Sequence, residues 1–315
     1  MKARILCFTA ILFFLVSCEP AELDSDYQKA GDESKPTAVP GYKLTIQAIK
    51  KMDTKALELE GNTLKAYWVD GEKVGVYVNG TYEGQLTATR EADSTKATLY
   101  GTLTNTSGIA TGATIMLLYP DRTDINIDEG TRWNYTGQNG AAPAPAGDLS
   151  TKYDYATATL SISNVDYDNH EVTTTGPAAF QNEQSVYRFG FLVAGEGQPI
   201  AVKDFTIASP KSMLVRTRSW SGTQWSSAHG SLTVTSPSAP AGNLYYMSLR
   251  NEYTGTGDEY AFTLVGSNDM LYLGSKAIAG SLSAGQFYTA PDITVNPVRF
   301  APDNSQVISR EQEVL

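Results

Sequence analysis

Short stretches of alternating apolar and polar residues run through the chain from residue 42 onward, and they restrict what it can fold into. In the first stretch, Tyr, Leu, Ile and Ala at positions 42, 44, 46 and 48 alternate with polar residues. A period of two is that of a strand with one buried face. Turn sequences such as Asn79-Gly80 separate the stretches, at a spacing of roughly 8 to 12 residues typical of sandwiches and barrels. No stretch of ten or more residues has a helical period, so we predict an all-β protein.

Residues 1–17 have the composition of a secretory signal peptide. After two basic residues, an apolar stretch runs from Ile5 to Val16, shorter than the roughly 20 residues needed to span a bilayer. It leads into a lipobox, Leu15-Val16-Ser17-Cys18, in which the small Ser17 admits a signal peptidase. We expect Cys18 to carry acyl chains, palmitate among them, and to begin the mature chain. The alternative is an ordinary cleaved signal whose cysteine stands there by chance.

Cysteine content and charge exclude several functions. Cys7 lies in the leader, so the mature chain keeps one cysteine, used for lipid, and forms no internal disulfide and no cysteine metal site. Without Lys2 and Arg4, 22 of the 24 basic residues face 34 acidic ones, and the net charge goes from -10 to -12. Nucleic acid is therefore excluded as a partner, because its binding rewards basic patches.

The composition changes along the chain and divides it. After Cys18 the residues are acidic and polar, which predicts a flexible tether. A polar, turn-rich stretch at about 165–180 predicts a boundary between two β-domains, and residues 137–147, rich in Gly, Ala and Pro, predict a long surface loop in the first of them. In order, we predict a signal peptide (1–17), a tether (18–40), two β-sandwich domains (41–175 and 176–296) and a C-terminal tail (297–315).

An enzyme needs positioned acids, bases, nucleophiles or metal ligands, and no such cluster stands out. His170 and His229 are far apart, and neither has the i+4 partner of a helical metal pair. A Gly-Lys-Ser phosphate loop and a Gly-X-Ser-X-Gly elbow are both missing from the sequence. We predict no catalytic residue, no metal ligand and no cofactor, and hence a protein that is not an enzyme.

Four aromatic residues support a different function, a surface that binds glycan or host protein. Exposed aromatic rings can stack on sugars. The candidate rings are those of Trp220, Trp225, Tyr245 and Tyr246. Aromatic residues of β-proteins also serve as core residues and cross-strand pairs. Both interpretations stay open at this point.

Assembly by strand exchange is suggested by residues 42–50. They form a good strand beside a flexible tether, and a cluster of Lys50, Lys51 and Lys55 follows. A trypsin-like protease acting at an exposed cluster there would release the strand and open a groove, which an extended segment of another chain could fill by main-chain pairing. The alternative is a first strand that stays in place.

The chain resembles the fimbrillins, the pilin family of Bacteroidales type V fimbriae, from the leader to about residue 295. The motifs that carry the resemblance are the lipobox, then Asp53-Thr54-Lys55-Ala56-Leu57, Trp68 to Tyr77, Leu118-Tyr119-Pro120, Leu149 to Ala156, Phe180-Gln181-Asn182, Arg188-Phe189-Gly190-Phe191 and Gly285-Gln286-Phe287-Tyr288. The resemblance implies two tandem transthyretin-like β-sandwich domains. It also implies lipoprotein export, proteolytic removal of the first strand and polymerisation by strand exchange.

Mapped onto this sequence, the resemblance makes Tyr42 to Lys50 the lost strand, with the cut after Lys51 or Lys55. Fimbrillins are commonly cut after arginine, and no arginine lies between Arg4 and Arg90. The resemblance therefore does not determine which peptide bond is cut. Residues 297–315 become the candidate donor strand of a stalk subunit in a fimbrium that serves adhesion. The alternatives are a tip or an anchor subunit, or a surface lipoprotein that does not polymerise.

The resemblance also fixes the expected location and partners. Acidic residues just after the lipid cysteine, as in Bacteroides-type bacteria, predict a lipoprotein of the outer membrane exposed on the cell surface. The expected partners are copies of the chain, other fimbrial subunits, the outer membrane through Cys18, and a host or bacterial surface ligand. Asp93-Ser94-Thr95 fits an O-glycosylation pattern of such bacteria, with Ser94 as the acceptor.

Overall fold

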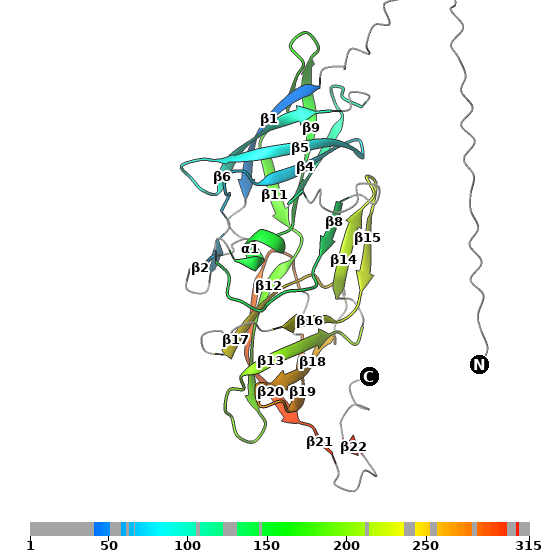
Figure 1. Ribbon diagram of the computed structural model, residues 1–315. Helices are drawn as coiled ribbons and strands as arrows, with labels where there is room; N and C mark the ends of the chain where they lie inside the picture. The colour runs from blue at the N-terminus through cyan, green and yellow to red at the C-terminus, as the bar shows by residue number, and fades with distance from the viewer. Residues whose placement is uncertain are drawn as a thin grey trace, which may run out of the picture. The chain divides into compact units, whose positions relative to one another are not determined.

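The protein is all-β, as predicted. The computed structural model describes residues 41–50, 58–60, 63–65, 67–104, 108–121, 131–144, 147–211, 214–235, 243–252, 257–278, 282–300 and 307–308. Within them the strands form two large sheets, one three-stranded sheet and two small hairpins, and the helix among them, α1 (Asp148–Lys152), has five residues (Figure 1). No described helix is long and apolar enough to cross a membrane.

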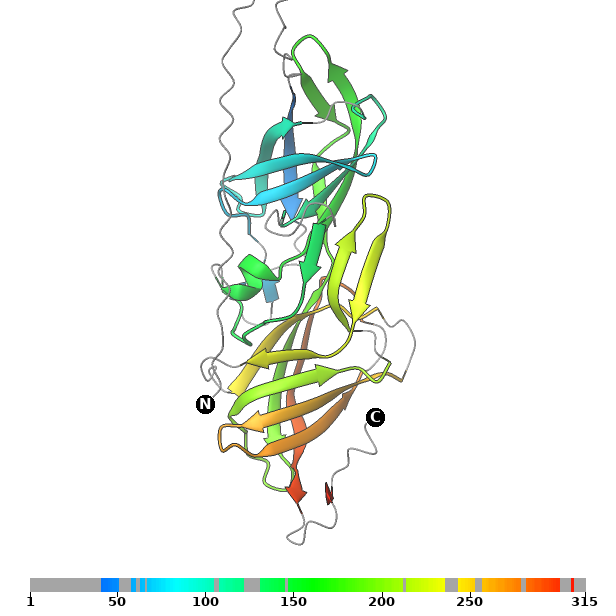
Figure 2. The ribbon, with the colours of Figure 1, turned by 45° about the vertical axis from the view of Figure 1, so that its right-hand side comes forward.

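The first large sheet has eight strands and closes on itself. Its order is β10-β1-β11-β9-β7-β4-β5-β6, and β1 pairs with β6 as well, so that β1 joins the two ends of the sheet. In Figure 2 the blue β1 lies between the cyan and green strands of this sheet. The strands are β1 (Tyr42–Lys50), β4 (Lys73–Val78), β5 (Thr81–Arg90), β6 (Lys96–Leu103), β7 (Thr114–Tyr119), β9 (Ala156–Asp166), β10 (Glu171–Thr174) and β11 (Ala178–Asn182).

Two of these strands are buried on both faces, which explains their continuous apolar runs. In β4, Val74, Val76 and Val78 belong to the core enclosed by the first sheet, whereas Tyr77 belongs to a second core. The same division places Leu117 in the first core and its neighbour Leu118 in the second. Neighbouring side chains of β4 and β7 therefore pack into two different cores.

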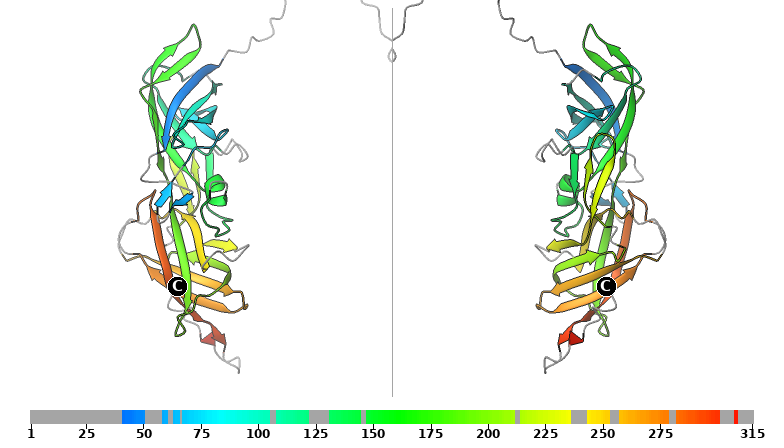
Figure 3. Two further views of the ribbon diagram at one scale, coloured as in Figure 1. Left: turned by 90° about the vertical axis from the view of Figure 1, so that its left-hand side faces the viewer. Right: turned by 90° about the vertical axis from the view of Figure 1, so that its right-hand side faces the viewer.

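The second large sheet has seven strands in the order β16-β13-β18-β19-β20-β12-β17. The long strands β12 and β20 run parallel, and Figure 3 shows them side by side in green and orange-red. Aromatic residues of β12, Phe189 and Phe191, pack edge-on against Phe205 and Phe262. The strands are β12 (Ser185–Val193), β13 (Val202–Ala208), β16 (Leu232–Thr235), β17 (Leu244–Leu249), β18 (Glu259–Gly266), β19 (Leu271–Ala277) and β20 (Phe287–Pro297).

A three-stranded sheet pairs residues far apart in the sequence. β8 (Thr131–Asn134) pairs with β14 (Val215–Trp220), which continues into β15 (Trp225–His229). In the second core, Trp133 and Tyr155 therefore pack with residues from beyond position 185. The first sheet itself continues past residue 175 through β11, because the buried Ala178 and Phe180 complete its core. The division into two domains at residues 175 and 176 stays a prediction.

The segment predicted as a surface loop is partly buried, and that prediction is corrected here. Gln138 is 2% exposed and exchanges two hydrogen bonds of 2.7 Å with the main chain of Ser248. The amide of Tyr246 donates to the carbonyl of Gly140. Both partners belong to β17, the last strand of the second sheet, so this segment covers an edge that would otherwise expose unpaired main-chain groups.

Four short strands form two hairpins that belong to none of these three sheets. β2 (Glu58–Glu60) pairs with β3 (Thr63–Lys65), and β21 (Arg299–Phe300) pairs with β22 (Val307–Ile308). The second pair lies in the predicted tail and belongs to neither large sheet. Beyond Phe300, only this two-residue strand of the tail is among the described residues.

Candidate functional site

β1 is the element on which the closure of the first sheet depends. On one side it pairs antiparallel with β6 over eight positions, from Tyr42 opposite Leu103 to Ile49 opposite Lys96. On the other side it pairs in parallel with β10 near its start and with β11 near its end. Since one strand connects both edges, its removal would leave a groove with an unpaired edge on each side.

The side chains of β1 follow the predicted alternation. Tyr42, Leu44, Ile46 and Ala48 are buried in the first core, whereas the residues between them face solvent. Burying the three large apolar side chains stabilises the strand by roughly 6 kcal/mol, at about 2 kcal/mol for each. The strand is thus held by a full row of apolar contacts as well as by two rows of main-chain hydrogen bonds.

Lys50 ends β1 and is the buried cation of this site. Its Nζ lies 4.4 Å from the centroid of the Trp68 ring and 4.2 Å from that of Tyr119. Two carboxylates face it, with Asp154 Oδ2 at 3.6 Å and Glu72 Oε2 at 3.7 Å. We call Trp68, Tyr119, Asp154 and Glu72 the Lys50 cage. Aromatic faces and carboxylates both attract the positive charge of an ammonium group.

Further contacts fix the parts of the cage. The hydroxyl of Tyr119 donates to Glu72 Oε1, and Glu72 Oε2 accepts from the amide of Val69 at 3.0 Å. Burial, with the charges of Glu72 and Asp154 nearby, raises the pKa of Tyr119 well above its ordinary value, so this hydroxyl remains a donor. The side chain of Asp154 is 1% exposed, and its Oδ2 has no hydrogen bond, so Lys50 supplies its compensation.

The cage collects residues from separate stretches of the sequence. Trp68, Tyr119, Asp154 and Phe180 each lie in one of the motifs that carry the family resemblance, and Phe180 packs edge-on against Trp68 at 5.4 Å. No single motif forms a binding environment for a cation. That environment arises only when the fold brings residues of several motifs around Lys50.

The prediction that Lys50 belongs to an exposed basic cluster is wrong. The residue is 2% exposed because the alternation that buries positions 42 to 48 also turns position 50 inward. This alternation is the sequence signal from which the burial of Lys50 could have been predicted. The other basic residues predicted for cleavage, Lys51 and Lys55, lie outside the described residues, as does the lipidation site Cys18.

The turn that carries Ser94 closes one end of the site. The carbonyl of Ser94 accepts from the amide of Trp68 at 2.8 Å, and that of Thr95 accepts from the amide of Lys50 at 3.0 Å. Ser94 itself is half-buried, and its glycosylation stays a prediction. The turn therefore holds both Lys50 and one wall of its cage.

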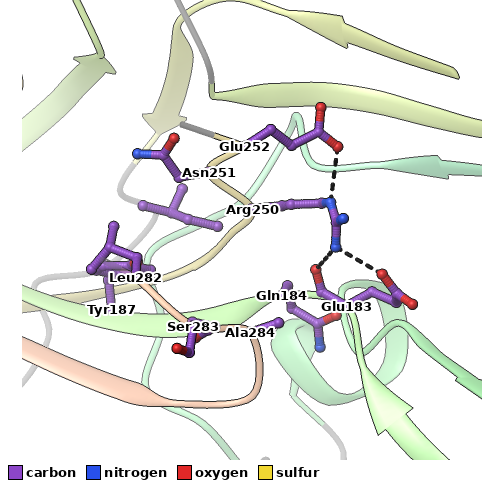
Figure 4. Close-up of a pocket in the computed structure, with 11 residues that line it drawn as sticks. Glu183, Gln184, Tyr187, Arg250, Asn251, Glu252, Leu282, Ser283 and Ala284 are labelled. Carbon is purple, nitrogen blue, oxygen red and sulfur yellow. Dashed lines mark hydrogen bonds and ion pairs between the residues drawn. The ribbon is translucent and has the colours of Figure 1, made fainter. Parts of the chain in front are cut away.

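A second candidate is a pocket of about 330 Å³ lined by Glu183, Arg250 and Glu252 among others (Figure 4). Arg250 donates to Glu183 Oε2 at 2.7 Å and to Glu252 Oε1 at 3.1 Å. Arg218 also donates to Glu183. The charges of these two arginines and two glutamates balance one another, as expected of an ion network that joins strands. These four side chains therefore have no net charge with which to select a charged ligand.

The titration of Glu252 fits this structural role. Burial disfavours its charged form, but hydrogen bonds from His229, Arg250 and Ser227 outweigh burial and lower its pKa. His229 Nε2 lies 2.8 Å from Glu252 Oε2. Of the two histidines, His229 therefore belongs to the network, whereas His170 lies in the turn beside Tyr42.

The aromatic surface proposed for glycan binding does not form. Tyr245 is fully buried, and its hydroxyl accepts a hydrogen bond from the amide of Val202. Tyr246 is buried in a different cluster, and Trp220 is 8% exposed and lies opposite Trp225 across a hairpin. The alternative interpretation, core and cross-strand aromatics, is the one that the structure supports. Among the described residues, no group of three or more His, Cys, Asp or Glu is placed to hold a metal ion.

Several solved structures are similar to this chain. A "putative cell adhesion protein" from Bacteroides ovatus has a TM-score of 0.45 and 10% identity, covering 82% of this chain and 96% of the other. One from Bacteroides uniformis has a TM-score of 0.44 and 12% identity, with coverages of 81% and 96%. A fimbrial protein from Bacteroides ovatus has a TM-score of 0.37 and 11% identity, with coverages of 82% and 50%. No protein-family model and no curated protein matches the chain.

Proposed function

We propose that the protein is a structural subunit of a cell-surface fimbrium that polymerises by strand exchange. In this proposal it is not an enzyme, and it is built from two transthyretin-like β-sandwich domains. It is exported as an outer-membrane lipoprotein on Cys18 and is activated when a protease cuts after Lys51 or Lys55. Its partners are other copies of the chain and other fimbrial subunits, and the filament serves adhesion to a host or bacterial surface.

The observation that carries the proposal is the place of β1 between β6 and the pair β10 and β11. A strand at the margin of an open sheet can leave without uncovering a core. β1 instead contributes Leu44 and Ile46, at 0% and 2% exposure, to the middle of the first core. Its loss would expose apolar side chains and two edges at once, and an open edge is a template for strand pairing.

The ends of β1 agree with its release as a unit. Gly41 precedes the strand directly after the predicted tether, and the predicted cuts lie one and five residues beyond Lys50. Lys50 is itself a basic residue, but burial and its hydrogen bond to Thr95 shield the bond that follows it. A cut after Lys51 or Lys55 would therefore remove the whole strand, the tether and the lipid together.

The donor in this proposal is the segment that follows β20. β20 ends at Pro297, and the next described strand, β21, pairs with β22 and with neither large sheet. A donor taken from beyond β20 would leave the core of the second sheet intact.

The experiment is limited proteolysis of the purified precursor with trypsin. Mass spectrometry locates the cut, and native gels with electron microscopy follow assembly. We expect fragments that begin at Met52 or Ala56, followed by ladders and filaments. The double variant Lys51→Gln/Lys55→Gln should stay uncut at these bonds and monomeric.

Deletion of residues 301–315 provides the second arm, because it removes most of the candidate donor, residues 297–315, but leaves β20 whole. This variant should be cut normally, keep its circular dichroism spectrum and fail to form filaments. A protein that loses β1 completely and still remains monomeric would overturn the proposal.

A further inference from the structure

The Lys50 cage holds an excess of negative charge once β1 is taken away. Asp154 and Glu72 both face Lys50, and no second basic group among the described residues forms an ion pair with either of them. Asp154 keeps a hydrogen bond of 3.3 Å from the side-chain amide of Gln184, but that group is neutral. A carboxylate at 1% exposure without a cation is costly, so the emptied groove is incomplete.

The aromatic walls make the cage selective for one kind of group. The faces of Trp68 and Tyr119 lie within 4.5 Å of Nζ, a distance at which ring quadrupoles attract a cation. An apolar side chain would fill the space but leave the carboxylates unpaired. An ammonium or guanidinium group at the position of Lys50 Nζ satisfies both.

We propose that this cage is a cation site that fixes the register of the incoming donor strand, and that Arg310 of the tail of a second copy occupies it. This inference rests on the strand exchange proposed above and adds its specificity. Because strand side chains alternate, a slip of one residue would turn the arginine out of the groove, and a slip of two would place it against apolar walls. One charged contact therefore selects one alignment of the nine-residue groove.

The sequence of the tail favours Arg310 over the other basic residue, Arg299. If the tail enters in the direction opposite to β1, Arg310 takes the place of Lys50, and Gln312 and Val314 take the places of Ala48 and Ile46. Glu311 and Glu313 would then point to solvent.

Arg299 fits the groove less well. It belongs to β21, two residues beyond the end of the second sheet, and an extended chain would put it on the same face as Asp303. An inward aspartate would add a third acid to a groove that already has two.

The first test measures the cage without the tail. Trimmed subunit is mixed with fluorescent peptides of residues 41–50 that have the native sequence, the change Lys50→Met or, as the outward-facing control, the change Lys43→Met. We expect the Lys50→Met peptide to bind on the order of a hundredfold more weakly than the native one. The Lys43→Met peptide should bind within about twofold, because its side chain is exposed.

A matched change in the subunit separates charge from shape. With Glu72→Gln and Asp154→Asn in place, the difference in affinity between the native and the Lys50→Met peptides should shrink to less than about fivefold, since neutral amides no longer need a cation. Equal binding of both peptides to the unaltered subunit would overturn the cation site. Failure of every peptide to bind would count against strand exchange itself.

The second test assigns the occupant. Filament growth of trimmed Arg310→Met should be at least tenfold slower than that of the unaltered chain, Arg310→Lys should restore it, and Arg299→Met should leave it within twofold. Filaments of Arg310→Met could grow normally while the native peptide still binds more tightly than the Lys50→Met peptide. In that case the cage takes its cation from another strand, and the assignment of Arg310 is wrong. If no variant forms filaments, the unaltered chain included, the proposed function fails instead.

Discussion

Lys50 Nζ and Asp154 Oδ2 face each other at 3.6 Å inside the first sheet, each on a side chain that is 1% exposed. Removing one partner of such a pair costs about 3 to 5 kcal/mol, because the other is left buried and uncompensated. We expect Lys50→Met to destabilise the intact precursor by this amount in urea unfolding, and Lys43→Met to change it by less than about 0.5 kcal/mol. Adding Asp154→Asn to Lys50→Met should recover part of the loss, and strict additivity of the two changes would argue against the pair.

Ile46 lies at the centre of β1 and is 2% exposed. Ile46→Asp would bury an unpaired charge, so we expect β1 to leave its place while the remaining strands stay folded. Amide hydrogen exchange should then speed up along β6, β10 and β11, the three strands that pair with β1. Thr45→Asp, on the solvent side of the same strand, should leave exchange unchanged. Similar exchange in both variants would show that β1 is held by its main chain rather than by its buried face.

Gly80 and Gly222 meet back to back where two turns touch. A Cβ on Gly222 would lie 2.0 Å from the carbonyl oxygen of Gly80, and the φ of Gly222 is +94°. We expect Gly222→Ala to cost at least about 3 kcal/mol, from backbone strain plus overlap.

Gly195→Ala is the matched control for Gly222→Ala. The φ of Gly195 is +79°, and no atom lies within 4 Å of its Cβ position, so only strain of about 1 kcal/mol applies. Thermal unfolding measures both variants. Equal losses would mean that the two turns part easily.

Acid should weaken the ion network through Glu252. Its pKa is lowered from an ordinary 4.5, so its contribution to stability is complete above 4.5 and is lost as the pH falls through the lower folded value. We expect Glu252→Gln to lower the melting temperature at pH 7 and to flatten its dependence on pH below 4.5. A slope identical to that of the unaltered protein would assign acid sensitivity to other carboxyl groups.

The sequence carried the local structure of β1 but not its role as the strand that closes the sheet. Alternation at 42–48 predicts the strand and its inward face, and one more step of the same parity would have placed Lys50 inside. The residues that receive it could not be found this way, because Trp68, Tyr119 and Asp154 lie 18, 69 and 104 positions away (68−50, 119−50, 154−50). Only the tertiary fold determines which of many aromatic and acidic residues meet.

Contacts between distant residues also explain why the surface-loop prediction was wrong and why the sequence left the role of the aromatic residues open. Gly and Pro between 137 and 147 signal irregular backbone, but whether that backbone covers a strand depends on Gln138 reaching Ser248, which is 110 positions away. Tyr245 and Trp225 have the same apolar character in sequence, whereas the structure buries one and leaves the other partly exposed. Whether an aromatic residue is buried depends on which elements the fold packs against it.

The geometry of β1 also has a mechanical consequence. The hydrogen bonds of an antiparallel pair run perpendicular to its strands, so a force along β1 loads its eight pairings with β6 in shear, all together. A force across the strand would break them one after another, like a zipper. Any load that reaches the molecule through the end of this strand is therefore shared by the whole row. The pairing of β1 with β6 should resist pulling far better than its equilibrium stability alone would indicate.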